Sequence, residues 1–161
     1  MVCAFSGHRP EHLPWGSDES DPRCRALQLK MRQTVAALAA QGFDTFLCGM
    51  ARGCDIYFFD AVQALREQQS ELKLIAVIPC RSQPDAWPQQ DRLRYAAALR
   101  ECSAVQIVSD RYYPGCMLER NRRMVDQADL LLTVWDGTHS GTASTVRYAR
   151  QRSVPIHALW L

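Results

Sequence analysis

The chain has 161 residues, of which 47% are hydrophobic and 22% charged, and its formal net charge is +2. These values exclude disordered and collagen-like classes, and no apolar stretch approaches the ~20 residues that a membrane-spanning helix needs. The first residues, Met-Val-Cys-Ala-Phe, show neither the basic segment nor the cleavage site of a secretion signal. We therefore expect a cytoplasmic protein with no membrane partner and one domain over residues 1–161.

Apolar segments rich in β-forming residues alternate with helical patterns along the chain. Residues 2–6 are expected to form the first strand. Asp21 and Pro22 then supply an N-cap and a first-turn proline to a helix that ends at Gly42. A strand at 43–48, a helix at 55–69 and a strand at 72–78, ending at Pro79, follow.

The second half of the chain repeats this alternation. It predicts a helix at 89–101, a strand at 104–108, a helix at 117–128, a strand at 130–135, a helix at 142–152 and a closing strand at 155–161. Strands separated by helices of ~10–15 residues indicate βαβ units, right-handed crossovers and a mainly parallel sheet. The expected fold class is α/β, a Rossmann-like three-layer sandwich.

Cysteine, histidine and arginine bear on the chemistry. The seven cysteines are widely spaced without a C-x-x-C pair, and the four histidines lack metal-ligand spacing, so we expect neither a disulfide framework nor a metal site. Nearly all the positive charge is arginine, with only Lys30 and Lys73 as lysines. The arginine fork binds phosphate in a bidentate way, but genomic base composition also explains the bias, so the positions of the arginines matter more than their number.

Ligands of open parallel sheets bind outside the carboxyl ends of the strands, which points to the loops at those ends. The loop at 6–10 combines a glycine turn with His8 and Arg9. The loop at 49–55 puts two glycines at a strand-to-helix turn, where backbone N–H groups favour an anion. It is neither G-x-G-x-x-G nor a P-loop. Asp55 either caps the following helix or serves a ligand, as acceptor for a ribose hydroxyl or as a general base.

Three further segments complete the expected crevice. In the loop at 136–142, Gly141 permits close approach of a phosphate, and Thr142 either donates to it or merely caps a helix. In the helix at 117–128, Arg120 is expected to point into the crevice, whereas Arg122 and Arg123 turn toward solvent. After the third strand, Trp87 either lies beside a base or serves packing.

In this order, the loops resemble the YpsA-like branch of the SLOG superfamily, which is related to Smf/DprA and LOG proteins. The resemblance runs from end to end and implies a Rossmann-like fold with a nucleotide-derived ligand. LOG proteins are phosphoribohydrolases with E-R-K-x-x-M and P-G-G-x-G-T-x-x-E segments. The segment 119–124 matches the first, and Arg120 falls on the position of the catalytic arginine.

The second LOG segment is degraded here. Asp136 and Gly137 replace Pro-Gly-Gly, and Thr145 stands at the position of the catalytic glutamate. A threonine cannot supply a carboxylate, and losing such a group typically costs about 10²–10⁴-fold in rate. Binding can survive this change, whereas hydrolysis through that position should not.

The leading hypothesis is a protein that senses or sequesters a nucleotide or ADP-ribose-type ligand, and the sequence indicates no certain cofactor beyond this nucleotide-derived ligand. The alternative is a nucleotide-processing N-glycosidase or phosphoribohydrolase-like enzyme, with Arg120, Asp55 and Asp136 as candidate catalytic residues. The small net charge disfavours nucleic acid. The apolar residues 57–59 serve either a homodimer interface or the core.

The candidate ligand-binding residues are Ser6, Gly7, His8, Arg9, Gly49, Met50, Arg52, Gly53, Asp55, Gln83, Trp87, Arg120, Asn121, Asp136, Gly137, Ser140, Gly141, Thr142 and Thr145.

Overall fold

A computed structural model describes residues 1–160, and its centre is one all-parallel sheet with strand order β4-β3-β2-β1-β5-β6. The strands are β1 (Val2–Gly7), β2 (Thr45–Cys48), β3 (Lys73–Cys80), β4 (Ala104–Ser109), β5 (Leu130–Val134) and β6 (Ile156–Leu159). This arrangement confirms the expected α/β class and the Rossmann-like three-layer sandwich.

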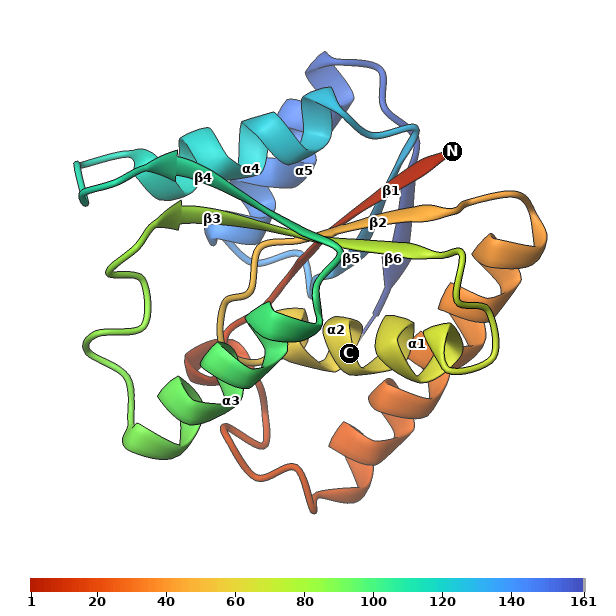
Figure 1. The fold of residues 1–161 in the computed structure, drawn as a ribbon, viewed down its shortest axis with the longest axis horizontal. Coiled ribbons are helices and arrows are strands. Elements are labelled where there is room, and N and C mark those ends of the chain that lie inside the picture. The colour runs from red at the N-terminus through yellow and green to blue at the C-terminus, as the bar shows by residue number, and fades with distance from the viewer. Residues whose placement is uncertain (161) are drawn as a thin grey trace.

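Helices cover both faces of the sheet (Figure 1). They are α1 (Pro22–Ala40), α2 (Cys54–Arg66), α3 (Gln89–Glu101), α4 (Cys116–Asp126) and α5 (Gly141–Gln151), with a short 3₁₀ turn at Pro10–His12. The first three lie on one face, and α4 and α5 lie on the other (Figure 1). The chain steps outward from β1 to β4 and then returns to β5, so the topological switch point, where such folds bind ligands, lies between β1 and β5.

The sheet separates two apolar layers. On the side of α1, α2 and α3, the rings of Phe5 and Phe58 stack with centroids 4.5 Å apart. Tyr57 and Phe59 are buried in this same layer, which confirms core packing for residues 57–59 and removes these rings from any exposed interface. On the other side, Val146 of α5 belongs to the smaller layer that α4 and α5 form against the sheet.

Most element boundaries lie close to their predicted positions, and the largest difference is in the helix predicted at 55–69, which ends at Arg66. Asp21 caps α1 as predicted, because its carboxylate accepts the Arg23 N–H at 2.8 Å. The predicted end of the third strand at Pro79 is wrong, because β3 continues to Cys80. The pairing with β2 ends at Ala76, so Pro79 lies where β3 pairs only with β4, and an edge position tolerates a missing N–H. The closing strand ends at Leu159, and position 161 of its predicted range lies outside the described residues.

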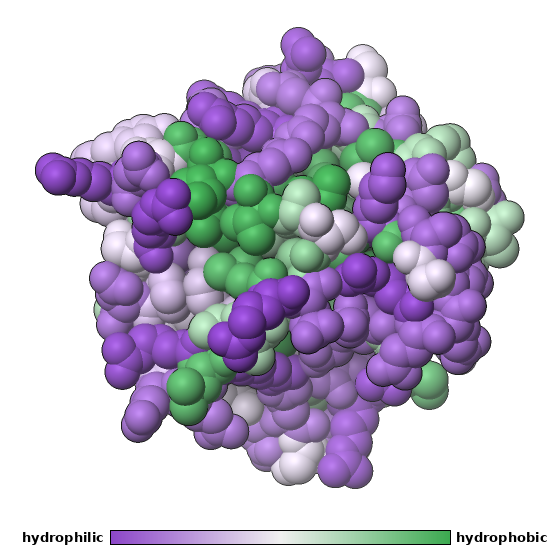
Figure 2. All heavy atoms as spheres, in the orientation of Figure 1, coloured by the Kyte–Doolittle hydropathy of each residue, from purple (hydrophilic) through white to green (hydrophobic). Residues whose placement is uncertain are grey.

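β4 forms one edge of the sheet and is only partly covered. Val105 is 41% exposed, and Figure 2 shows apolar side chains gathered along this edge between more hydrophilic surfaces.

Within residues 1–160, no helix has both the length and the apolar character needed to cross a bilayer. All seven cysteines are free, six of them are buried, and burial raises the pKa of Cys3 to about 12.

Candidate functional site

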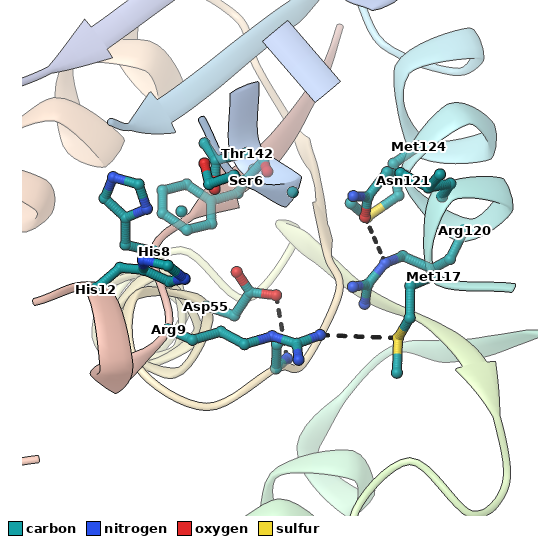
Figure 3. A pocket seen from close by; sticks show the side chains of 16 residues that line it. Ser6, His8, Arg9, His12, Asp55, Met117, Arg120, Asn121, Met124 and Thr142 are labelled. Atoms are coloured by element: carbon teal, nitrogen blue, oxygen red, sulfur yellow. Dashed lines mark hydrogen bonds between the residues drawn. The ribbon is translucent and has the colours of Figure 1, made fainter. Parts of the chain in front are cut away.

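A cavity of about 260 Å³ opens beside the carboxyl end of β1. Four segments that are distant in sequence meet there: the end of β1 with its loop, the start of α2, α4 and the start of α5 (Figure 3). Its lining residues are Phe5, Ser6, Gly7, His8, Arg9, His12, Ala51, Asp55, Met117, Leu118, Arg120, Asn121, Met124, Ser140, Gly141 and Thr142. The cavity therefore lies at the switch point of the sheet.

Arg120 enters the cavity from α4 and is buried. Its guanidinium donates to the carbonyl of Gly49 and, through Nε, to Oδ1 of Asn121 at 2.6 Å. A Cβ on Gly49 would lie 2.6 Å from Cζ of Arg120 and 2.9 Å from the carboxylate of Asp55. The glycine that follows β2 is thus what admits the arginine head group, although Gly49 itself does not line the cavity.

Asp55 faces Arg120 from the first turn of α2. Its carboxylate accepts the Ala51 N–H at 3.1 Å, and Asp55, Arg9 and Arg120 point toward one another in Figure 3. Burial raises the pKa of the Asp55 carboxyl, against the opposing effect of the Arg120 guanidinium, and burial also lowers the pKa of Arg120. The helix-capping alternative for Asp55 is wrong, because α2 begins after Gly53 and no side chain caps it.

Arg9 reaches across the mouth of the cavity from the loop after β1. Its Nη2 lies 3.8 Å from the sulfur of Met117 (Figure 3). Within residues 1–160, neither Arg9 nor Arg120 has a carboxylate oxygen within 4 Å. Two guanidinium groups therefore share this cavity with one buried carboxyl group, Asp55, which favours an anion such as phosphate.

The N-terminus of α5 forms the opposite wall. Ser140 caps the helix and accepts the Ala143 N–H at 3.2 Å, so the helix-capping alternative for Thr142 is wrong. Gly141 and Thr142 line the cavity in the first helical turn, and a Cβ at Gly141 would meet no other part of residues 1–160 within 4 Å outside its own helix turn. First-turn N–H groups have no partner within their helix and carry the positive end of its dipole, so this wall too favours an anion.

His8 is almost fully buried at the end of β1. Its Nε2 lies 2.9 Å from Oδ1 of Asp136, and its Nδ1 has no partner among the described residues. Bonds from the hydroxyl and backbone N–H of Thr138, and further from His8, lower the pKa of the Asp136 carboxyl. Asp136 does not line the cavity, and its bond to His8 connects it to the site.

Other predicted residues support the cavity from behind. Gln83 donates to the carbonyls of Gly49 and Met50, at 3.3 and 3.4 Å. Thr145 accepts from Nδ2 of Asn121 at 2.9 Å and so joins α5 to α4. These contacts hold the loops and helices that carry Arg120.

Gly53 also acts from behind, through its backbone. It has a φ of +84°, and a Cβ there would lie 2.8 Å from the carbonyl oxygen of His8. Its lack of a side chain lets the loop after β2 pack on the loop after β1. The adjacent Cys54 N–H donates to that same carbonyl at 3.1 Å.

The structure places the remaining predicted residues elsewhere. Arg52, Gly53 and Trp87 line a separate hollow of about 40 Å³, and Gly137 lines another at the end of β5. Trp87 packs edge-on against Tyr95 with centroids 5.3 Å apart, so the packing alternative for this ring is confirmed.

Sequence reasoning also missed six lining residues: Phe5, His12, Ala51, Met117, Leu118 and Met124. Of these, Met117 and Met124 share helical spacing with Asn121. That spacing marks the cavity-facing side of α4 and offered a usable signal.

A family model described as the YspA SLOG family matches residues 3–158. The chain belongs to this family. Among its relatives, the UPF0398 protein of Bacillus pumilus is 25% identical over 143 residues, covering 88% of this chain and 76% of the relative. The UPF0398 protein YpsA of Bacillus subtilis is 22% identical over 143 residues, covering 88% and 79%. The YpsA-like resemblance is therefore confirmed.

Two solved structures of DNA processing protein A share the fold of this SLOG protein. The Helicobacter pylori protein, described for its single-stranded DNA binding mode, superposes with a TM-score of 0.66 at 18% identity. The Streptococcus pneumoniae protein superposes with a TM-score of 0.61 at 16% identity. The match covers 98% of this chain but only 64% and 49% of those chains, and at such identity it shows the fold alone.

Proposed function

We propose that this protein binds the phosphate and sugar of a nucleotide or ADP-ribose-type ligand in the 260 Å³ cavity, and that it senses or sequesters that ligand in the cytoplasm. One observation carries the proposal. The guanidinium groups of Arg9 and Arg120, neither of them held by a carboxylate within 4 Å among residues 1–160, face the same cavity as the N-terminus of α5. Each of these features favours an anion on its own, and their convergence favours a phosphate.

The hydrogen bonds of the Thr145 hydroxyl support ligand binding rather than LOG-type hydrolysis. Its hydroxyl accepts from Asn121 and donates to the carbonyl of Gly141 at 3.1 Å, so it serves the packing of α4 against α5. A hydroxyl held in this way neither stabilises an oxocarbenium-like centre nor activates water as a carboxylate does.

Calorimetric titration with AMP, ADP-ribose and NAD tests the proposal, supported by melting curves. A saturable ligand should raise the melting temperature, because binding to the folded state stabilises it. Arg9→Gln should weaken the affinity about tenfold, since a bond to a charged group is lost at an exposed position. Arg25→Gln is the matched control, because Arg25 is also exposed but lies in α1 away from the cavity. Absence of binding by all three compounds at millimolar concentration would contradict the proposal.

Asp55 favours a second candidate function, a nucleotide-processing N-glycosidase. Its buried carboxyl lines the cavity, and burial raises its pKa, as is common for acid–base catalysts. Product analysis after incubation with nucleotides should then detect free base, and Asp55→Asn should abolish the release. Asp85→Asn is the control, because Asp85 is exposed and does not line the cavity. Base release that survives Asp55→Asn would remove Asp55 from this role.

Single-stranded DNA is a competing ligand, because the H. pylori protein that shares this fold is described as binding it. A net charge of +2 offers little of the electrostatic attraction on which such binding depends. We therefore expect no retention of an oligonucleotide at physiological salt. Retention that weakens steeply with added salt would favour DNA over the small nucleotide.

A further inference from the structure

A second hollow of about 230 Å³ lies between α4 and α5 and adjoins the cavity. Leu118 and Asn121 line both spaces, so the two spaces meet at these side chains. Arg122, Ser144, Arg147 and Tyr148 are among the residues along the rest of this groove. On α5 these positions follow helical spacing and present one face, beginning one turn beyond the Gly141 end that we assign to phosphate.

The charged residues that line the groove are all positive. Its lining contains two arginines and no aspartate or glutamate. Arg147 is exposed, and neither it nor Arg122 has a carboxylate oxygen within 4 Å among residues 1–160. The nearby carboxylate of Asp126 is occupied by the hydroxyl of Tyr148 at 2.9 Å and by Arg152 at 3.1 Å.

The groove also has a fixed wall. The guanidinium of Arg122 lies 5.6 Å from the centre of the Tyr148 ring, in a cation–π contact that holds the arginine over the groove. The hydroxyl of Tyr148 is anchored on Asp126, which fixes the ring in turn. Arg122 is thereby positioned without its charge being neutralised.

We propose that this groove binds the second phosphoryl group of a pyrophosphate-linked nucleotide, together with the sugar that this phosphate carries. The inference rests on the proposed function, because it extends the ligand from the first cavity. The first phosphate lies at Arg9, Arg120 and the N-terminus of α5, and the second passes Asn121 to reach Arg147 and Arg122. Ser144 and Gln151, which also line the groove, offer polar groups for sugar hydroxyls.

Calorimetry that compares the affinities of AMP, ADP and ADP-ribose tests the assignment of the groove. The wild-type chain should bind ADP and ADP-ribose about tenfold more tightly than AMP, since only they carry the second phosphate. Arg147→Gln should remove this advantage and leave the AMP affinity unchanged, and Arg122→Gln should act in the same direction. Arg123→Gln is the control, because Arg123 lies on the same helix but pairs with Glu119 at 3.0 Å and lines neither space.

The outcomes separate the two proposals. If AMP binds and the second phosphate adds no affinity, the groove assignment is wrong and the proposed function stands. The same holds if Arg147→Gln weakens AMP as much as ADP-ribose. If none of the three nucleotides binds the wild-type chain, the proposed function fails, and the groove assignment fails with it.

Discussion

Residues of the loop that joins β2 to α2 line two arginine-containing hollows, and these hollows differ in how their arginines are paired. The larger, of about 260 Å³, holds Arg9 and Arg120, which have no carboxylate partner within 4 Å among residues 1–160. The smaller, of about 40 Å³, holds Arg52 and Arg94. These two bind the carboxylates of Asp91, Glu11, Glu19 and Asp60.

The difference shows that arginine content does not identify a phosphate site. Arg52 bonds Asp91 at 2.7 Å and Arg94 bonds Asp60 at 2.6 Å, so both charges are already used in holding the loop and α3 to the core. In the larger cavity the guanidinium of Arg120 donates to a neutral carbonyl and a neutral amide. Its charge is therefore still available to a ligand.

The largest effect is expected when this available charge is removed. Arg120→Gln should weaken the binding of AMP by about 10- to 100-fold, because a bond from a buried charged group to phosphate is worth about 1.5–3 kcal/mol. Calorimetry measures the affinity, and circular dichroism checks that the variant is folded.

Arg94→Gln is the matched comparison for Arg120→Gln. It removes an arginine from the paired hollow, so it should lower the melting temperature without changing the affinity. If both variants weaken AMP binding equally, the distinction between paired and unpaired arginines is wrong. Arg9→Gln keeps the test decisive should Arg120→Gln fail to fold.

Gly49→Ala should have the next largest effect. It should lower the unfolding free energy, because it fills the space that the Arg120 guanidinium occupies. The added methyl group would lie 2.6 Å from Cζ of Arg120 and would displace the guanidinium. Overpacking of this kind costs about 1–3 kcal/mol of unfolding free energy, which urea denaturation measures. Gly141→Ala is the control, because its added Cβ would meet no other part of residues 1–160 within 4 Å outside its own helix turn. Equal stability of the two variants would show that Arg120 moves aside freely.

The order and type of the elements were predictable because local signals and the global fold agree. The Asp21 cap and the first-turn Pro22 set the start of α1, and the regular alternation of strands and helices led to the parallel sheet. Parallel order then placed the strand-end loops at one edge, which is why Arg9, Asp55 and Arg120 were found together.

The helical pattern indicated the direction of Arg120, but the direction of side chains in the loops could not be predicted from the sequence. Arg52 and Asp55 lie three residues apart in the same loop region, yet Arg52 turns to Asp91 and Asp55 turns to the cavity. Partners 39 residues away decide such choices, and no local pattern encodes them. Thr142 and Ser140 show the same limit on a smaller scale, since either residue type caps a helix and only the backbone geometry selects Ser140.

A smaller effect is expected from Arg52→Gln, which tests the paired hollow directly. The partly exposed ion pairs of Arg52 should contribute about 0.2–1 kcal/mol to the unfolding free energy. Urea denaturation should detect this loss, and adding salt should reduce the difference from wild type because exposed pairs are screened. Nucleotide affinity should not change. A clear loss of nucleotide affinity would show that Arg52 contributes to ligand binding.

The smallest effect concerns Asp136, whose carboxylate, like those that pair with Arg52, is already bonded within the protein. Its pKa is held below the ordinary value of about 3.9 by Thr138 and His8. A depressed pKa contributes stability that is present above the ordinary value and is lost as the pH falls toward the folded value. The unfolding free energy of the wild type should therefore fall more steeply below about pH 4 than that of Asp136→Asn. Urea denaturation at stepped pH measures both curves, with the exposed Asp85→Asn as the control. Parallel curves for wild type and Asp136→Asn would mean that the bonds to Thr138 and His8 do not persist in solution, and His8 would then be free to turn its ring within the cavity.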